Sequence, residues 1–306
     1  MQSIQVEKIG TYTGHRDCIY GLVGGISPQH FFSSGADGLV VAWNMKDPDR
    51  GELMAKVTNS VYSMAFDSSA QRLWLGENFR GIHLIDCITR KEISSSAITS
   101  SYIFSLLHHD GLLYCACGDG TVVILDDIQL GVVARWKYSE KSARALALSP
   151  DGKHLAVGYS DHHVRIFSLE DRNLMVSIPA HENSVFTLAY SQDGKQLLSG
   201  GRDARLKIWN VNAGYALQQS IVAHMYAIND IAFSPDGRYF VTCSMDKSIK
   251  VWDAKVFQLL KVIDKARHAG HGTSVNKVLW TRYNGYIVSG SDDRNVSVWN
   301  LKFNRS

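Results

Sequence analysis

The residues His, Ser or Thr, Asp and Trp recur together four times along this chain, always at the same spacing. The steps between them are 18, 4 and 6 residues in every copy. A fixed pattern at a period near ~40 residues predicts a repeat architecture, in which each unit buries its faces against its neighbours. The four tetrads are His15, Ser33, Asp37 and Trp43; His181, Ser199, Asp203 and Trp209; His224, Thr242, Asp246 and Trp252; and His271, Ser289, Asp293 and Trp299.

Alternating apolar residues precede each Trp, which predicts a β-strand. The same alternation occurs at three places without Trp, so seven such strands are expected. They end at Trp43, Ile85, Leu125, Phe167, Trp209, Trp252 and Trp299, with spacings of 42, 40, 42, 42, 43 and 47 residues. The sequences SPDG at 149–152, SQDG at 191–194 and SPDG at 234–237 predict β-turns between consecutive strands. We therefore predict an all-β fold, a seven-bladed β-propeller of four-stranded antiparallel blades.

Taken together, these features resemble the WD-repeat β-propeller family. The resemblance is carried by Gly14-His15, the SPDG turns, Ser199-Gly200 with Asp203, and the closing pairs Trp209-Asn210, Trp252-Asp253 and Trp299-Asn300. It extends over the entire chain and implies one propeller over residues 1–306.

Three blades depart from the tetrad. In the second blade, the same offsets hold Val57, Leu75, Phe79 and Ile85, which predicts a consistent apolar replacement. The third keeps Asp119, with Cys115 and Leu125 at other tetrad positions. The fourth keeps Asp161, with Ser139, Val157 and Phe167 at the other positions, so we expect only turn amides to hold this carboxylate.

The last blade lacks residues for an outer strand of its own, because only residues 300–306 follow Trp299. Residues 4–9 alternate between apolar and polar side chains and lie just before Gly14-His15. We predict that this N-terminal strand completes the seventh blade and removes an exposed edge. The family resemblance implies the same closure.

Composition and charge disfavour several classes of protein. The net charge of +3 is too small and dispersed to indicate nucleic-acid or anionic-membrane binding. No apolar run approaches the roughly 18 residues of a membrane span, and the first residues do not read as a secretory signal. The five cysteines are irregularly spaced, which favours reduced cysteines in a cytoplasmic protein over a disulfide framework.

Ser, His and Asp together suggest a hydrolase, but their fourfold repetition with Trp favours a structural hydrogen-bond network. His268 and His271 lie in an insertion over 265–272 that could hold a metal. However, no Cys or carboxylate cluster accompanies it, and His271 belongs to a tetrad. We therefore expect no metal, no cofactor and no catalytic residues.

A propeller without chemistry offers its faces to partners. The family resemblance implies contacts at three positions per blade: three and five residues after each tetrad His position, and one residue before each Asp position. The last two of these positions are the informative ones, and each gives a set of residues. The first set is Tyr20, Tyr62, Phe104, Arg144, Phe186, Asn229 and Asn276; the second is Ala36, Asn78, Gly118, Ser160, Arg202, Met245 and Asp292. Aromatic residues and arginine are typical of binding hot spots, so blades one to five are expected to carry the contacts, with blades six and seven polar.

We therefore predict a non-enzymatic scaffold, monomeric by itself, that binds a protein or peptide partner on the face around the channel. The predicted contact residues are Tyr20, Tyr62, Phe104, Arg144, Phe186, Asn229, Asn276, Asn78, Arg202 and Met245. A reader of nucleic acid or a small ligand is an alternative, since aromatic residues with arginines can stack on bases, although the weak net charge disfavours it. An enzyme would need polar groups converging on the channel mouth, and Arg144 and Arg202 have no expected acidic partner there.

Overall fold

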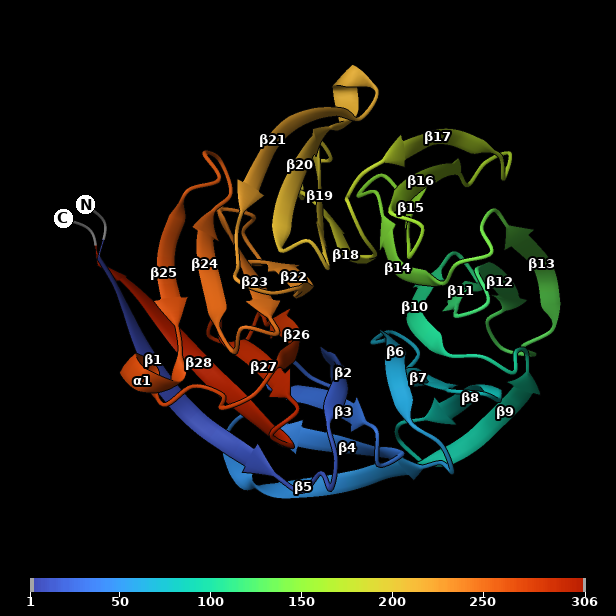
Figure 1. Ribbon diagram of the computed structural model, residues 1–306. Coiled ribbons are helices and arrows are strands. Elements are labelled where there is room, and N and C mark those ends of the chain that lie inside the picture. Colours follow the sequence, from blue (N-terminus) through green and yellow to red (C-terminus); the bar gives the residue numbers. More distant parts are fainter. Residues whose placement is uncertain (1–2, 305–306) are drawn as a thin grey trace.

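Seven four-stranded antiparallel sheets form a ring around a central channel (Figure 1). The structure is a computed structural model that describes residues 3–304. In six blades the four strands follow one another in chain order, and the first strands of neighbouring blades contact each other around the channel. The prediction of a seven-bladed propeller is confirmed.

The strands of the first three blades are β2 (Ile19–Gly24), β3 (His30–Gly35), β4 (Leu39–Asn44) and β5 (Asp47–Lys56); β6 (Val61–Asp67), β7 (Arg72–Glu77), β8 (Gly81–Asp86) and β9 (Lys91–Ala97); and β10 (Ile103–His109), β11 (Leu112–Cys117), β12 (Thr121–Asp126) and β13 (Val132–Lys137). Blades four and five are β14 (Ala143–Leu148), β15 (His154–Tyr159), β16 (His163–Ser168) and β17 (Leu174–Pro179); and β18 (Val185–Tyr190), β19 (Gln196–Gly201), β20 (Arg205–Asn210) and β21 (Ala216–Val222), with a 3-10 turn at Val211–Ala213. Blade six is β22 (Ile228–Phe233), β23 (Tyr239–Ser244), β24 (Ile249–Asp253) and β25 (Leu259–Ile263). The helix α1 (Lys265–His268) then leads into β26 (Val275–Trp280), β27 (Ile287–Ser291) and β28 (Asn295–Asn304) of blade seven.

The N-terminal strand β1 (Ser3–Thr13) closes the ring. It pairs antiparallel with β28, in a register that places Ile4 opposite Phe303 and Tyr12 opposite Val296. The strand is longer than the predicted span of residues 4–9, and its far end reaches blade one. There the buried Tyr12 ring packs against Phe31 and Trp43, with ring centroids 5.5 and 5.6 Å away. The predicted closure is confirmed, and β1 also helps to join blade seven to blade one.

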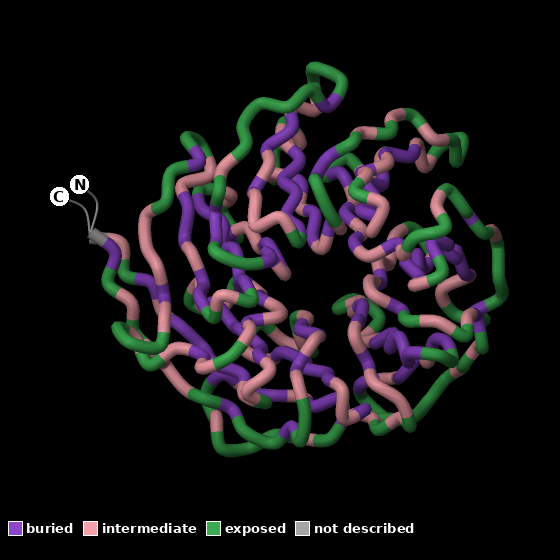
Figure 2. The backbone as a smooth tube through the Cα atoms, in the orientation of Figure 1, coloured by how far each residue is buried: buried purple, intermediate pink, exposed green. Residues whose placement is uncertain are grey.

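The apolar core consists of seven clusters, each shared by two neighbouring blades. Leu197 and Leu198, adjacent on β19, show the principle. Leu197 packs towards blade four, and Leu198 packs towards blade six, because successive side chains of a strand point to opposite faces. Figure 2 shows buried residues concentrated on the inner strands, with many exposed residues on the outer strands. Each sheet thus buries its faces against two neighbours.

The SPDG and SQDG segments form the expected turns between the first and second strands of their blades. In the first of them, the Ser149 hydroxyl donates to Asp151 Oδ1 at 2.6 Å. Gly152 adopts a positive φ of 72°, a conformation that glycine enters without the usual steric cost. The turn therefore requires the residue types that the sequence supplies.

In all four tetrads the side chains form one hydrogen-bonded chain. In blade five, Trp209 Nε1–H donates to Ser199 Oγ at 2.9 Å, and the Ser199 hydroxyl lies 2.7 Å from His181 Nε2. His181 Nδ1 lies 2.9 Å from Asp203 Oδ1. The carboxylate also accepts from the backbone N–H of Glu182 and of Arg205. Asp203 thereby ties the loop before β18 to the loop before β20.

The electrostatics of this network follow from burial and pairing. Burial alone would raise the pKa of Asp203, but the hydrogen bond and charge of His181 lower this pKa to about 2. Burial lowers the pKa of His15 and of His224 in their own tetrads, against the opposing effect of their aspartates. These histidines are therefore held in the neutral form, which can donate from Nδ1 and accept at Nε2.

Blade two does not carry the fully apolar replacement that the sequence analysis predicts. Leu75 and Ile85 are buried as expected, but Phe79 is 49% exposed. In place of the tetrad, the buried Glu77 accepts from the backbone N–H of Thr58 and of Asn59 and pairs with His83 Nε2 at 2.8 Å. A carboxylate still holds the loop before the innermost strand, but it comes from the end of β7.

Blade four also differs from the prediction that only turn amides hold Asp161. Arg165 Nη2 lies 2.8 Å from Asp161 Oδ2, and the carboxylate accepts from His163 N–H as well. Burial alone would raise the pKa of Asp161, but hydrogen bonds from Arg165 and Ser139 lower it overall. The Arg165 guanidinium also lies 4.6 Å from the centre of the Tyr159 ring. An arginine from β16 therefore pairs with the aspartate that has lost its tetrad histidine.

We expect Asp203→Ala to lower the free energy of unfolding by about 3 kcal/mol. The substitution removes the acceptor of the buried N–H groups of His181 and of the two loops. Asp161→Ala should cost less, since Arg165 is partly exposed and can recover hydration. Urea unfolding of both variants measures the difference. In the double variant Asp161→Ala/Arg165→Gln, the loss should be smaller than the sum of the single losses. Equal losses in the two aspartate variants would contradict this assignment.

Deletion of residues 1–10 should destabilise the entire ring, because blade seven loses its outer strand and exposes an edge. Thermal unfolding and size-exclusion chromatography should show a lower Tm and self-association. Glu7→Gln serves as the control, since it removes only the solvent-exposed ion pair with Lys302. A deletion variant that remains monomeric at an unchanged Tm would show that closure by β1 is dispensable.

The lowered pKa values of His15 and His224 predict acid sensitivity. Their unfolded forms bind protons below about pH 6.5 more readily than the folded protein does, so stability should be full above that pH and fall below it. We expect the free energy of unfolding to fall between pH 7 and pH 5. The variant His15→Gln/His224→Gln should be less stable at pH 7 but lose less on acidification. An identical pH dependence in both proteins would refute this source of the sensitivity.

Candidate functional site

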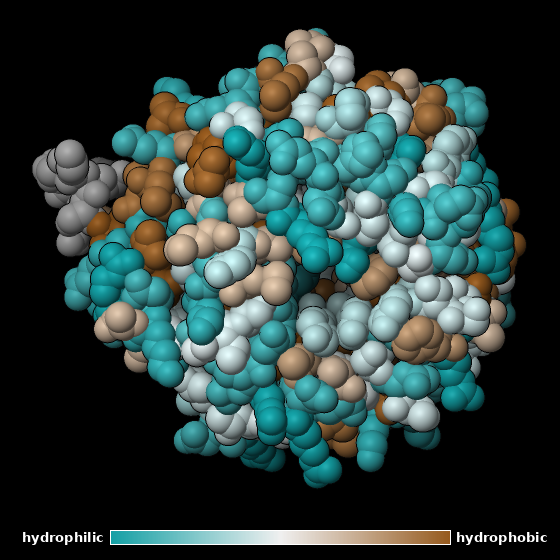
Figure 3. Space-filling model, viewed as in Figure 1, coloured by the Kyte–Doolittle hydropathy of each residue, from teal (hydrophilic) through white to brown (hydrophobic). Residues whose placement is uncertain are grey.

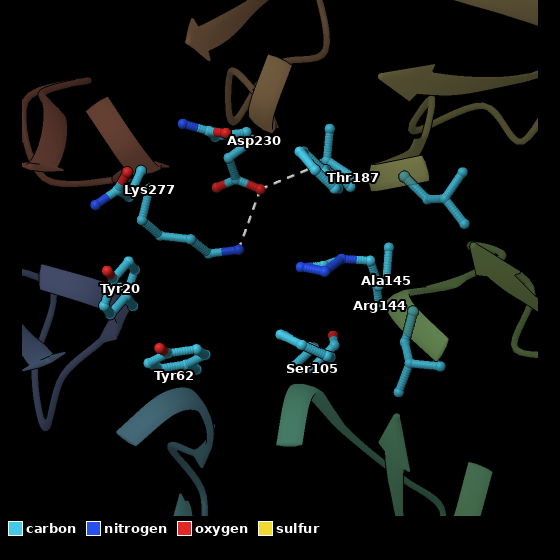
Figure 4. Close-up of a pocket in the computed structure, with 14 residues that line it drawn as sticks. Tyr20, Tyr62, Ser105, Arg144, Ala145, Thr187, Asp230 and Lys277 are labelled. Atoms are coloured by element: carbon cyan, nitrogen blue, oxygen red, sulfur yellow. Dashed lines mark hydrogen bonds and ion pairs between the residues drawn. The ribbon is translucent and has the colours of Figure 1, made fainter. Parts of the chain in front are cut away.

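One pocket at the channel is lined by residues from the innermost strands of all seven blades (Figure 4). The lining includes the second residue of each of these strands. These are the residues found five positions after the tetrad His position: Tyr20, Tyr62, Phe104, Arg144, Phe186, Asn229 and Asn276.

Local backbone geometry explains why these positions reach the channel. The first residue of every innermost strand is fully buried between blades, as Ile19 and Val61 illustrate. In each blade the pairing with the second strand then shifts register across the next residue, for example between Ile19 and Gly21. The residue inside each shift has no partner in the ladder, which is the signature of a β-bulge. The bulge residue thus leaves the packed face and points into the channel.

The side of the pocket formed by blades one to three is aromatic. The ring centroids of Tyr20 and Tyr62 lie 4.4 Å apart, and those of Tyr62 and Phe104 lie 6.2 Å apart. Tyr102 stacks on both Tyr62 and Phe104 and is itself 38% exposed. The exposed Phe79 ring meets Tyr102 edge to face at 4.5 Å. These five residues are called the aromatic cluster below. Tyr102 and Phe79 are not among the contact residues predicted from the sequence. Their aromatic side chains next to predicted contact positions could have indicated them.

Arg144, the bulge residue of blade four, lies between the phenylalanine rings of the bulge residues of blades three and five. Its guanidinium carbon is 4.1 Å from the centre of the Phe104 ring and 4.7 Å from that of Phe186. No carboxylate among residues 3–304 pairs with Arg144. Burial lowers the pKa of this guanidinium, and the neighbouring positive charge of Arg202 acts in the same direction.

The opposite side of the pocket, from blades six and seven, is polar and internally bonded. Asn229 Nδ2–H donates to the Val275 carbonyl at 2.8 Å, and Asn276 Nδ2–H donates to the Ile19 carbonyl at 3.1 Å. Both amides therefore join one blade to the next, a role that the sequence analysis does not assign to them. Asn276 also donates to Asp292 Oδ1 at 2.7 Å.

An ion pair in the same pocket, between the buried Asp230 and the partly exposed Lys277, is absent from the set of residues predicted from the sequence. Asp230 Oδ1 lies 3.1 Å from Lys277 Nζ and accepts from the Thr187 hydroxyl at 3.2 Å (Figure 4). Asp230 Oδ2 accepts from the Val278 N–H. These residues directly follow the bulge residues of their strands, so the spacing was visible, but their mutual contact across blades was not.

The second set of predicted contact positions, one residue before each tetrad Asp position, does not line this pocket. Asn78 is fully buried, where its amide donates to Ser60 Oγ at 2.8 Å and its Oδ1 accepts from Ile103 N–H. Its prediction as a contact residue is therefore wrong in this structure. Arg202 is exposed, and Met245 is 51% exposed.

Blade six is polar at its pocket positions, but exposed apolar side chains lie outside the pocket. Met225 is 81% exposed and Tyr226 is 61% exposed in the loop before β22, on the same side of the ring as Met245. In Figure 3 the channel mouth appears as a hollow near the centre of a largely hydrophilic face.

The described residues contain no group of three or more His, Cys, Asp or Glu side chains placed to hold a metal. In the insertion, His268 ends the short helix α1, and His271 is bonded within its tetrad. All five cysteines are free, and four of them are buried. Over residues 3–304, no helix has the length and apolar character needed to cross a bilayer.

Comparison with known proteins agrees with this architecture. The family described as WD domain, G-beta repeat matches residues 6–44, 172–210, 216–253 and 263–300, which together make up about half of the chain. The family described as Anaphase-promoting complex subunit 4 WD40 domain matches residues 133–190. The four matches to the first family contain the four tetrads.

Two individual proteins show the same likeness. The WD repeat-containing protein SL1-17 of Schistosoma mansoni is 28% identical over 173 residues, which are 56% of this chain and 58% of that protein. The crystal structure of the WD40 β-propeller domain of Doa1 matches with a TM-score of 0.85 at 18% identity, over 97% of both chains. Repeats, fold and closure together show that the chain belongs to the WD-repeat β-propeller family.

Proposed function

We propose that this protein is a non-enzymatic scaffold that binds a protein or peptide partner at the channel mouth. The observation that carries the proposal is the ring of bulge residues, which turns one side chain per blade away from the core and into one pocket. The aromatic members of this ring belong to none of the apolar core clusters, so their rings are available for recognition. Members of the WD-repeat family generally mediate protein interactions, which supports the proposed scaffold function.

The aromatic cluster has the properties of an interaction hot spot. Large rigid rings lose little conformational freedom on contact, and they dominate binding energy at many interfaces. Tyr102 and Phe79 combine this chemistry with exposure of 38% and 49%. Their rings continue outward from Tyr62 and Phe104, so one partner segment could contact the pocket and the outer rings together.

The tetrads support a structural rather than a catalytic role. The hydroxyl-bearing residue of each tetrad, such as Ser199, is fully buried, and its oxygen is bonded to both His and Trp. A nucleophile needs access to its substrate. The proposal includes a cytoplasmic location, which the five free cysteines support, since reduced thiols are the norm in that compartment.

Tyr62→Ala and Tyr102→Ala test the proposed surface. Each should weaken partner binding by about 2 kcal/mol, or roughly thirtyfold in Kd, because a central aromatic anchor is lost. Proteins that co-purify with the tagged wild type can be quantified against each variant, and the affinity of each recovered partner then measured with purified components.

Ile88→Ala provides the matched control. Ile88 is 76% exposed and lies between β8 and β9, at the opposite end of the blade, so binding should be unchanged. Thermal unfolding separates folding from recognition in every variant. If Tyr102→Ala binds as well as wild type while Ile88→Ala does not, the partner surface lies on the other face.

A further inference from the structure

The pocket contains three charged side chains, and only one of them lacks a partner of opposite charge. Lys277 and Asp230 neutralise each other at 3.1 Å, and Asp230 is further satisfied by Thr187 and by the Val278 N–H. Arg144 contacts two aromatic rings but has no ion pair or hydrogen bond with any described residue. The pocket therefore carries one uncompensated positive charge, at Arg144.

The surroundings of Arg144 restrict how a ligand could approach it. Phe104 and Phe186 lie close to its guanidinium and contribute cation–π attraction. The remaining hydrogen-bond donors lie at the edge of the group, and Figure 4 shows this end of the side chain pointing into the middle of the pocket. A planar guanidinium edge matches the two oxygens of a carboxylate, which it can bind through two parallel hydrogen bonds.

We propose that Arg144 receives the carboxylate of an Asp or Glu side chain from the partner, presented by an extended segment that enters the channel mouth. The proposal rests on the scaffold function proposed above and adds the chemical class of the partner's anchoring residue. An acidic peptide would remove the uncompensated charge, and its neighbouring residues could lie on Tyr102 and Phe79.

The local charges favour a carboxylate over a phosphate group. The buried Asp230 carboxylate lies in the same pocket and is already paired with Lys277. Within the pocket, which Arg202 does not line, a phosphate of nearly two negative charges would therefore meet the one guanidinium of Arg144 and a fixed carboxylate. A carboxylate carries a single negative charge and matches Arg144 alone.

The test uses a library of short linear peptides with randomised positions, displayed on phage and selected against the folded protein. We expect selection on the wild type to enrich Asp or Glu at one fixed position beside apolar or aromatic residues. Selection on Arg144→Gln should lose the acidic preference. Arg16→Gln is the control, because Arg16 is an exposed arginine in the loop before β2 and does not line the pocket.

A selected peptide then allows a complete cycle of four affinities. On the wild type, replacing its acidic residue with the neutral amide should weaken binding by about thirtyfold, as expected for a buried charge pair. On Arg144→Gln the same replacement should have little effect. A phosphorylated residue at that position should bind more weakly than Glu.

Each outcome distinguishes this proposal from the scaffold function. Peptides that depend on Tyr102 but show no acidic preference would overturn the carboxylate site and leave the scaffold function standing. An acidic preference that persists in Arg144→Gln, or tighter binding of the phosphorylated peptide, would also overturn it. If no peptide is enriched, or if the enriched peptides bind Tyr102→Ala and Arg144→Gln as tightly as they bind the wild type, both proposals fail.

Discussion

The packing of each blade against the next is the constraint on which the rest of the structure depends. A single four-stranded sheet has two apolar faces, and here each of the seven core clusters is shared by neighbouring blades. The ring must therefore close, since an open end would leave one face of a blade without cover. β1 provides the last strand of blade seven, and Tyr12 carries the contact into blade one. The chain's first strand and its last three thus form one sheet, so closure joins the two ends of the chain.

The side chains that hold the loops by hydrogen bonds vary more between blades than the packing of the blades does. Four blades use a tetrad in which Asp, His, a hydroxyl and Trp satisfy one another. Blade two uses Glu77 with His83, and blade four uses Asp161 with Arg165. Each of these solutions places a carboxylate against at least one backbone N–H group and adds a contact from a nearby His or Arg side chain. The shared requirement is an acceptor for buried loop amides, and several residue types meet it once the supporting side chain comes from an adjacent strand.

This variation explains how far the sequence could predict the molecule. Period, strand alternation and turns report local chemistry, so they predicted the seven blades and the strand that closes them. The fixed spacing of the tetrad failed where a residue at another position supplies the carboxylate, as Glu77 does in blade two. It also failed for Asn78, whose position is common to all blades but whose amide is buried by contacts with Ser60 and Ile103. The pairing of Asp230 with Lys277 joins two blades, and nothing in a single repeat encodes it.

The bulges show how a repeated fold can carry an asymmetric site. Within each innermost strand, the first residue packs between blades and the next one leaves the ladder for the channel. Packing therefore places little restriction on the second residue, which is Tyr, Phe, Arg or Asn in different blades. Asn229 and Asn276 use this freedom to bond to the next blade, whereas Tyr20, Tyr62 and Phe104 use it to form a surface of rings. The register shift is the same in all seven blades, so the chemistry of the pocket is set by which side chain each blade places at its bulge.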